Sequence, residues 1–205
     1  TIEILKKNEI TKTIKTDYVI LATGSLPRKL PNIEIDEKVI LSSDGIGHIK
    51  DFPKSMVILG AGVIGCEYAT IFANIGKTKV FIIDKQDRIL PFEDKDISNL
   101  ISENFEKKGI VIHKESQLTR MEILNGQVEY ELMDKEGNAS IHHVEKALVS
   151  VGRVPNTRNL GIEELGVEMT DQGHIVGTNT QSSVKNIYAV GDLTDHMALV
   201  NVSEL

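Results

Sequence analysis

Three glycines at fixed spacing are the residues of this sequence best placed to do chemistry. They stand in the stretch Gly60, Ala61, Gly62, Val63, Ile64, Gly65. The first glycine permits a tight turn, the second lets the backbone approach a pyrophosphate, and the third lets a helix pack closely on a strand. Backbone N–H groups at the start of that helix receive the phosphates, helped by the positive end of the helix dipole. The motif predicts a dinucleotide-binding loop.

An acidic residue follows this loop at the distance that such a site requires. Asp84 lies 19 residues after Gly65, where a carboxylate can accept hydrogen bonds from both hydroxyls of the adenosine ribose. This favours NAD over NADP. Lys85 and Arg88 leave NADP open, because either side chain can pair with a 2′-phosphate and offset the repulsion from Asp84.

The elements around the motif supply the context that gives it meaning. The apolar run Met56–Leu59 precedes the glycines and predicts a strand, and apolar residues then recur at helical spacing until Gly76. A second strand is expected over Lys79–Ile83, with Asp84 at its end. Strand, helix and strand in this order form a βαβ unit, the setting in which the motif binds a dinucleotide.

Other polar residues carry weaker signals. Glu67 lies two residues beyond Gly65; it is either near a bound nicotinamide or simply an acid stabilised at a helix N-terminus. Cys66, among apolar neighbours, is expected to be a small buried residue without chemistry. His142 and His143 fall in an alternating strand, so they point to opposite faces and cannot share a metal. We expect no metal site and no hydrolytic constellation.

The composition is that of a globular chain of 205 residues, 40% hydrophobic and 26% charged. A net charge of -7 gives no electrostatic footprint for nucleic acid or for an anionic membrane surface. The longest apolar runs fall short of the roughly 18 residues that span a bilayer, and the start has no signal-peptide layout, so we expect a cytoplasmic protein. The single cysteine excludes an internal disulfide within these residues.

The rest of the chain predicts further strands. Ile2–Leu5 and Glu9–Ile14 are expected to form a hairpin with one buried face, and Tyr18–Ala22 a parallel strand covered on both faces. A second helix is expected over Asp94–Lys108, with one apolar face formed by Ile97, Leu100, Ile101 and Phe105. A short strand at 110–113, a β-meander over 118–144 and a buried strand at 147–151 follow, the meander being indicated by Asn125-Gly126.

These elements predict an α/β fold: a three-layer Rossmann-type domain with a β-meander. Proline- and glycine-rich stretches place its boundaries near Asp51 and Gly152. We therefore expect three segments, 1–51, 52–151 and 152–205. The absence of an initiator methionine suggests an excised piece of a longer protein.

Four motifs together resemble the flavin-dependent pyridine nucleotide-disulfide oxidoreductases, in particular the dihydrolipoamide dehydrogenase and soluble pyridine nucleotide transhydrogenase branches. The motifs are Ala22–Ser25, Val57–Tyr68, Val151–Asn156 and Ile187–Asp192. In this family an NAD-binding domain is inserted into an FAD-binding domain of similar fold. The resemblance implies that 1–51 and 152–205 are two parts of an incomplete FAD domain.

The resemblance also implies roles for individual residues. For NAD, it places Gly60–Gly65 at the pyrophosphate, Asp84 at the adenosine ribose, Leu118 at the adenine, and Glu67 and Gly152 near the nicotinamide. For FAD, it implicates Thr23, Gly24, Ser25, Asp192, Ala198, Leu199, Val200 and Asn201. The family's redox cysteine pair, its base and its dimerisation domain lie outside these residues, so we expect no catalytic residue here and a homodimer in the full-length protein.

The implied function is transfer of a hydride between a nicotinamide cofactor and flavin. We expect this chain alone to bind NAD(H), to hold FAD weakly or not at all, and to be inactive, and the residues after Asp192 depart somewhat from the dehydrogenase pattern. The alternative is a non-catalytic NAD(H)-binding or redox-sensing module.

Overall fold

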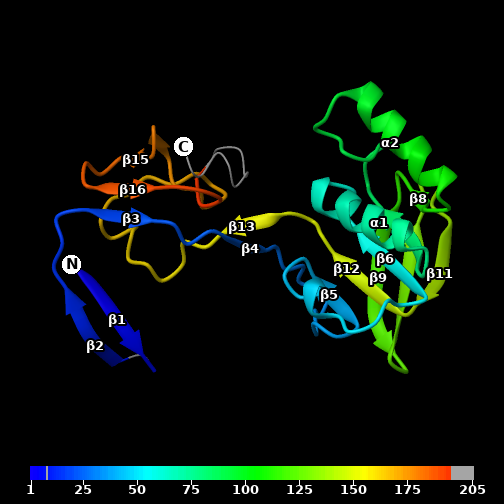
Figure 1. Cartoon of the computed structure of the whole chain (residues 1–205), viewed down its shortest axis with the longest axis horizontal. Helices are drawn as coiled ribbons and strands as arrows, with labels where there is room; N and C mark the ends of the chain where they lie inside the picture. Colours follow the sequence, from blue (N-terminus) through cyan, green and yellow to red (C-terminus); the bar gives the residue numbers. More distant parts are fainter. Residues whose placement is uncertain (8, 195–205) are drawn as a thin grey trace. The chain divides into compact units, whose positions relative to one another are not determined.

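The structure is a computed structural model that describes residues 1–7 and 9–194 (Figure 1). The chain divides into two compact units: residues 1–26 together with the residues from Arg153 on, and residues 27–152. We call them the flanking unit and the central unit. Within the described residues, no helix is long and apolar enough to cross a membrane.

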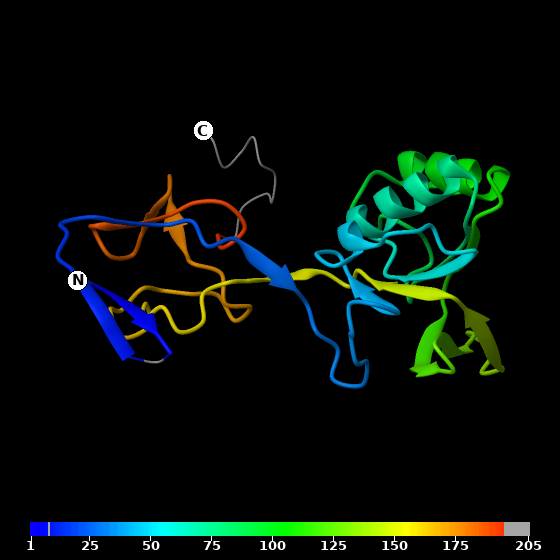
Figure 2. The same ribbon diagram turned by 60° about the horizontal axis from the view of Figure 1, so that its bottom comes forward.

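The central unit is built on a parallel sheet of five strands in the order β5-β12-β6-β7-β8. The strands are β5 Ile40–Ser42, β12 Lys146–Val149, β6 Ser55–Leu59, β7 Lys79–Ile83 and β8 Val111–His113. Two helices, α1 Val63–Ile75 and α2 Lys95–Lys107, cover one face, and an antiparallel meander covers the other (Figure 2). These three layers confirm the predicted α/β fold of Rossmann type.

The β-meander consists of β9 Gln117–Leu124, β10 Gln127–Met133 and β11 Ala139–Val144, paired in the order β11-β10-β9. Asn125 and Gly126 both have positive φ, as the expected tight turn requires. Alternate residues of β10, among them Val128 and Tyr130, are fully buried against the parallel sheet. The meander therefore closes the second hydrophobic layer of the unit.

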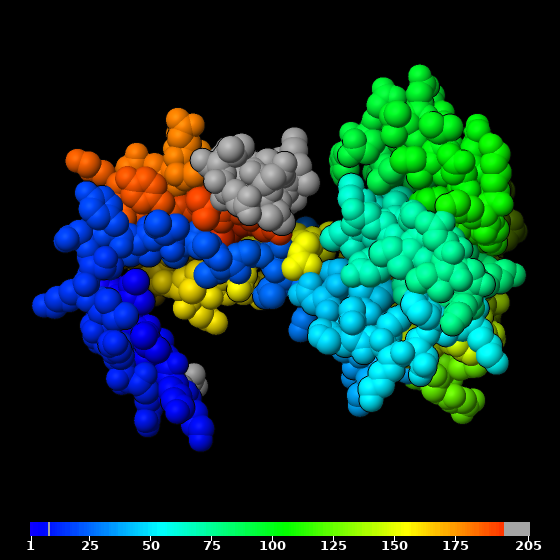
Figure 3. Space-filling view, in the orientation of Figure 1, coloured from blue at the N-terminus to red at the C-terminus, as the bar shows by residue number. Residues whose placement is uncertain are grey.

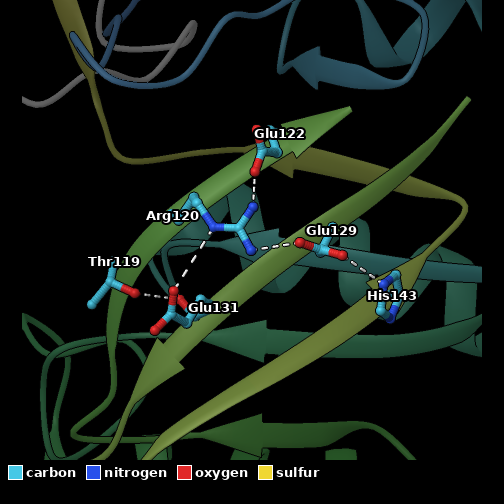
Figure 4. A network of polar contacts seen from close by, with 6 residues as sticks. All are labelled: Thr119, Arg120, Glu122, Glu129, Glu131 and His143. Atoms are coloured by element: carbon cyan, nitrogen blue, oxygen red, sulfur yellow. Dashed lines mark hydrogen bonds and ion pairs between the residues drawn. The ribbon is translucent and has the colours of Figure 1, made fainter. Parts of the chain in front are cut away.

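The outer face of the meander carries a network of charged side chains (Figure 4). Arg120 of β9 pairs with Glu122, Glu129 and Glu131, and Glu129 also contacts His143 at 2.9 Å. Hydrogen bonds from Arg120 and His143 lower the pKa of the Glu129 carboxyl. Because Arg120, Glu122 and His143 are 39% to 59% exposed, solvent screens much of the attraction within these pairs.

The helices begin and end where the sequence predicts, but α2 buries a different face. Gly76 ends α1 with φ 72°, and Lys108 ends α2. Ile97 and Leu100 are 51% and 55% exposed, whereas Ser98 and Ser102 are buried together with Phe105. The predicted apolar face was right for Ile101 and Phe105, which pack into the core, and wrong for Ile97 and Leu100. The Ser98 hydroxyl donates to the Leu90 carbonyl at 3.0 Å, so that Ser98 lies on the buried side of the helix. In Figure 3 the turquoise residues of α1 adjoin the green residues of α2 on the surface of the central unit.

The first expected boundary, near Asp51, was placed too late. Strand β5 comes before that residue, yet it pairs with β12 within the central sheet. Leu41 and Ile46 also belong to the hydrophobic core between the sheet and the two helices. The central unit therefore begins at Pro27. Its other end, between Gly152 and Arg153, lies one residue from the expected position.

The flanking unit combines segments from both ends of the chain. Strand β3 Val19–Leu21 pairs in parallel with β16 Ile187–Ala189, and the sheet continues through β15 Gln181–Ser182 to β14 Gly177–Thr178. A small core lies against this sheet. It is formed by Ile162, Val167, Ile175, Ile187, Ala189 and Leu193.

Two expectations about burial in the flanking unit were wrong. The hairpin of β1 Ile2–Lys6 and β2 Glu9–Ile14 forms as predicted, but every described residue of it is exposed, because its two strands form a separate sheet. In β3, Ile20 is 71% exposed. This strand lies at the edge of its sheet, and the core covers only the face that bears Leu21.

Candidate functional site

The glycine-rich loop lies between β6 and α1, at the carboxyl end of the central sheet. Gly60 has φ +100°, and a Cβ there would lie 2.6 Å from the Ser150 carbonyl oxygen. A Cβ on Gly65 would lie 2.1 Å from the Gly60 carbonyl oxygen. Both glycines are therefore required by the packing of the protein itself, the first for its backbone conformation and the second for the approach of helix to strand.

Gly62 differs from these two glycines. Its φ is -75°, which any residue can adopt, and a Cβ there would meet nothing within 4 Å. The fold therefore gives no reason for glycine at this position. Open space at the start of α1, where the backbone can be approached closely, fits a ligand that lies against the loop.

The start of α1 is also free to receive an anion. Its N-cap is Gly62, which supplies no side-chain hydrogen bond. By contrast, α2 begins at Asp94, whose carboxylate accepts hydrogen bonds from the N–H groups of Asp96 and Ile97. The first N–H groups of a helix have no partner within the helix. In α1 these groups and the positive end of the dipole face the loop and suit a phosphate.

Asp84 lies beside this loop, at the end of β7. Its Oδ2 accepts a hydrogen bond from the Ala61 N–H at 2.6 Å, and its Oδ1 accepts one from the Gln86 N–H at 2.9 Å. The carboxylate is half-buried. Each oxygen keeps a second lone pair, so the group can still accept hydrogen bonds from a diol.

The two basic residues after Asp84 occupy different environments. The Arg88 guanidinium donates through Nη2 to the Pro91 carbonyl oxygen at 2.7 Å and is partly buried. Lys85 is exposed. Of the two cations that the sequence offers to a 2′-phosphate, Arg88 is thus already bound within its own loop.

The remaining residues expected at the nicotinamide dinucleotide are more dispersed. Glu67 is exposed on α1, on the helix that the loop begins. Leu118 is half-buried at the start of the meander and packs into the meander-side core. Gly152 has φ +104°, and its carbonyl accepts a hydrogen bond from the Arg28 N–H at 3.0 Å.

One residue at the loop was not singled out from the sequence. The Ser150 hydroxyl lies 3.0 Å from the Leu59 carbonyl oxygen and 3.1 Å from that of Gly60. Ser150 is 9% exposed. The available signal was a hydroxyl within the apolar run 147–151, directly before Gly152.

Cys66 is buried beneath the loop and donates its S–H to the Ala61 carbonyl oxygen at 3.4 Å. Burial, followed by the negative charges of Asp84 and Glu67, raises the pKa of the thiol to about 12. The group is therefore a neutral thiol and a poor nucleophile. This agrees with the expectation that Cys66 is a small buried residue.

The histidine pair points to opposite faces, as predicted. His142 stacks on Tyr130 with ring centroids 5.1 Å apart, while His143 contacts Glu129 on the outer face. In the part of the chain that the structure describes, no three histidine, cysteine or carboxylate groups are arranged to hold a metal ion.

The residues expected at FAD come together in the flanking unit. The Ser25 hydroxyl donates to Oδ2 of Asp192 at 2.6 Å, and Gly24, with φ 68°, turns the chain before it. The Thr23 hydroxyl donates to the Asn156 carbonyl oxygen at 2.7 Å. The expected positions Ala198, Leu199, Val200 and Asn201 lie outside the described residues.

Arg153 completes this group, although the sequence did not indicate a role for it. Its Nε donates to the Ser25 hydroxyl oxygen, and its Nη2 donates to the Ser25 carbonyl oxygen, both at 2.7 Å. The motif Val151–Asn156 thus meets the motif Ala22–Ser25 through direct hydrogen bonds.

Comparison with known proteins decides the family. The model of the pyridine nucleotide-disulphide oxidoreductase family matches residues 1–204. The chain belongs to this family. Its cofactors are a pyridine nucleotide and FAD, and its members are oxidoreductases.

Curated relatives from this family match over almost the whole chain. A dihydrolipoyl dehydrogenase of Bacillus subtilis is 39% identical over 199 residues, which are 95% of this chain and 41% of the relative. One from Chlamydia pneumoniae is 36% identical over 194 residues, 94% of this chain and 41% of the relative. A soluble pyridine nucleotide transhydrogenase of Yersinia enterocolitica is 31% identical over 204 residues, which are 99% of this chain and 43% of the relative. The chain spans about two fifths of the length of these relatives.

Solved structures of the family share the fold. The flavoprotein disulfide reductase RclA of Escherichia coli superposes with a TM-score of 0.82 at 28% identity, covering 92% of this chain and 42% of that one. LpdA of Mycobacterium tuberculosis gives a TM-score of 0.81 at 28% identity, covering 91% and 40%.

Proposed function

We propose that the central unit binds a nicotinamide adenine dinucleotide at the loop Gly60–Gly65, and that the full-length protein passes a hydride between this nicotinamide and FAD. The observation that carries the proposal is Gly62, a glycine that the fold does not need, at the uncapped start of a helix. A pyrophosphate that approaches the backbone explains both features.

The residues of the loop bind and orient the dinucleotide. The N–H groups at the start of α1 hold the pyrophosphate, and Asp84 accepts hydrogen bonds from the adenosine ribose while it keeps its bond to Ala61. Leu118 packs against the adenine, and Glu67 and Gly152 lie along the nicotinamide half. These last three roles rest on the resemblance of the motifs.

The cofactor preference follows from the charges next to the ribose. Asp84 repels a 2′-phosphate, and Arg88 is held by the Pro91 carbonyl. Lys85 alone is an incomplete counter-charge, because it must balance both the phosphate and the carboxylate. We therefore favour NAD over NADP.

The flanking unit supplies part of an FAD site in this proposal. Asp192, oriented by Ser25, holds the ribityl chain, while Thr23 and Gly24 turn beside the flavin nucleotide. FAD supplies the hydride chemistry when it is bound, and the protein supplies alignment. A dihydrolipoyl dehydrogenase-like or transhydrogenase-like activity is consistent with the relatives, and homodimerisation and a cytoplasmic location stay predictions.

Calorimetric titration of the chain with NADH and with NADPH, at one ionic strength, tests this proposal. We expect NADH to bind at least tenfold more tightly, a difference of about 1.4 kcal/mol. The variant Asp84→Asn, which keeps the shape and removes the charge, should narrow that ratio, and Lys85→Ala should widen it. Failure of both nucleotides to bind would contradict the proposed function, and equal binding would contradict the NAD preference alone.

A further inference from the structure

The peptide group between Gly60 and Ala61 is held at both of its ends. It is one rigid plane that carries the Gly60 carbonyl and the Ala61 N–H. The carbonyl accepts a hydrogen bond from the Ser150 hydroxyl at 3.1 Å, and the N–H donates to Asp84 at 2.6 Å. Ser150, which follows β12, and Asp84, which follows β7, therefore hold the two ends of the same peptide group.

The neighbouring backbone groups are also satisfied. The Gly60 N–H donates to the Ile83 carbonyl at 2.9 Å, and the Ala61 carbonyl accepts from the Leu90 N–H at 2.8 Å. The loop is thus bonded on every side up to Ala61, and the helix start that follows is open. This division separates the part of the loop that the protein holds from the part that faces a ligand.

Within this arrangement the Ser150 hydroxyl has two acceptors. It shares its proton between the Leu59 and Gly60 carbonyls, but Leu59 already accepts a hydrogen bond from the Ser150 N–H at 2.9 Å. The donor that the structure gives to the Gly60 carbonyl is the hydroxyl. Without it, that carbonyl loses its partner in a tightly packed place, and the peptide plane is held only by Asp84.

We propose that Ser150 is a positioning residue for dinucleotide binding and selectivity, acting through the Gly60–Ala61 peptide on the Asp84 carboxylate. This proposal rests on the proposed function: Ser150 keeps the Asp84 carboxylate oriented toward the adenosine ribose. If the plane turns, the Ala61 N–H leaves Asp84 Oδ2, and the carboxylate loses the bond that orients it. The N–H groups that follow in the loop are displaced with it.

The test compares Ser150→Ala with a matched control in the full chain. The control is Thr78→Val, which removes another buried hydroxyl from the same unit. The Thr78 hydroxyl donates to the Pro53 carbonyl at 2.6 Å, near the amino-terminal ends of β6 and β7. Both variants and the wild type are titrated with NADH and NADPH, and circular dichroism verifies that each is folded. The informative quantity is the ratio of the two dissociation constants, because a loss of stability alone lowers both affinities equally.

We expect Ser150→Ala to weaken NADH binding at least fivefold and to narrow the NADH preference, while Thr78→Val leaves both unchanged. ADP-ribose should weaken by the same factor as NADH, since the loop faces the pyrophosphate. An unchanged ratio in Ser150→Ala would overturn the proposal. If the wild type binds neither nucleotide, it is the proposed function that fails.

A measurement on the wild type covers the case in which Ser150→Ala does not fold. Amide hydrogen exchange, followed by NMR, should show the Ala61 N–H to be protected to the level of the β6 and β7 amides. Rapid exchange at Ala61 would mean that the plane is not held, which overturns the proposal without any variant.

Discussion

The Ser25 hydroxyl donates a hydrogen bond to Asp192 at 2.6 Å, although 167 residues separate the two in the sequence. Its orientation is set by Arg153, whose Nε donates to the same oxygen. Since that oxygen accepts from the arginine, its own proton is directed to the carboxylate. One short network thus connects the first and last described segments of the flanking unit.

Ser25→Ala should destabilise the flanking unit. The substitution removes the charge-assisted bond to Asp192 and leaves Arg153 Nε without this acceptor, so we expect the free energy of unfolding to fall by about 1–3 kcal/mol. Urea denaturation followed by circular dichroism measures the change. Thr23→Val, which removes an exposed hydroxyl nearby, is the control and should cost less. Equal effects would contradict the importance of the Asp192 bond.

Gly62→Ala should separate ligand binding from folding. Because the site has open space and an ordinary φ, we expect a loss of stability of about 1 kcal/mol at most, from alanine at the N-cap, together with at least tenfold weaker NADH binding. Gly65→Ala is the matched substitution in which the fold itself is crowded, and it should lower stability by about 1–3 kcal/mol. Normal NADH binding by Gly62→Ala would show that no ligand approaches the backbone there.

Acidification from pH 7 to pH 5 should lower the free energy of unfolding of the central unit, because His113 becomes protonated. Its ring stacks with Phe81 between sheet and meander, and burial, followed by the proximity of His142, lowers its pKa below the ordinary 6.5. The unfolded chain then binds the proton more readily, so stability present above pH 6.5 is lost as the pH falls through the lower folded pKa.

The variant His113→Phe keeps a stacked ring and removes this titration. Its free energy of unfolding, measured by urea denaturation at several pH values, should depend less on pH over that window than that of the wild type. Identical slopes would show that His113 does not account for the acid sensitivity.

Cys66 should resist alkylation in the folded chain. A pKa of about 12, against 9.0 for an ordinary thiol, reduces the thiolate fraction about a thousandfold, and burial blocks access as well. Iodoacetamide at pH 8 should therefore label the native chain far more slowly than the chain in urea, as mass spectrometry can follow. Rapid labelling of the native chain would contradict the buried position beneath the loop.

The parts of the fold that could be predicted are those with a strong local cause. The strand before Gly60, the helix ended by Gly76 and the turn at Asn125-Gly126 all follow from backbone requirements that single residues impose. The position of Asp84 beside the loop follows from the βαβ unit, since adjacent parallel strands end at the same edge.

The predictions from sequence failed where contacts between residues far apart in the sequence determine the structure. Ile97 and Leu100 have the spacing of a buried face, yet serines of the same helix pack instead, because the hydroxyl of Ser98 finds a carbonyl 8 residues earlier. Strand β5 joins the central sheet by pairing with β12, which follows it by more than a hundred residues. The position of Ser150 at the loop could not be predicted for the same reason, because its hydroxyl contacts the Leu59 and Gly60 carbonyls, about 90 residues earlier in the sequence.

The central unit begins and ends at one hydrogen bond, between the Arg28 N–H and the Gly152 carbonyl at 3.0 Å. A segment whose two ends meet can be lifted out of its host and set into another without stretching either chain. We therefore expect residues 27–152 to be exchangeable as one segment, because its first and last residues are adjacent in space. If this unit binds the dinucleotide as proposed, nucleotide recognition can be inherited separately from the segments that flank it.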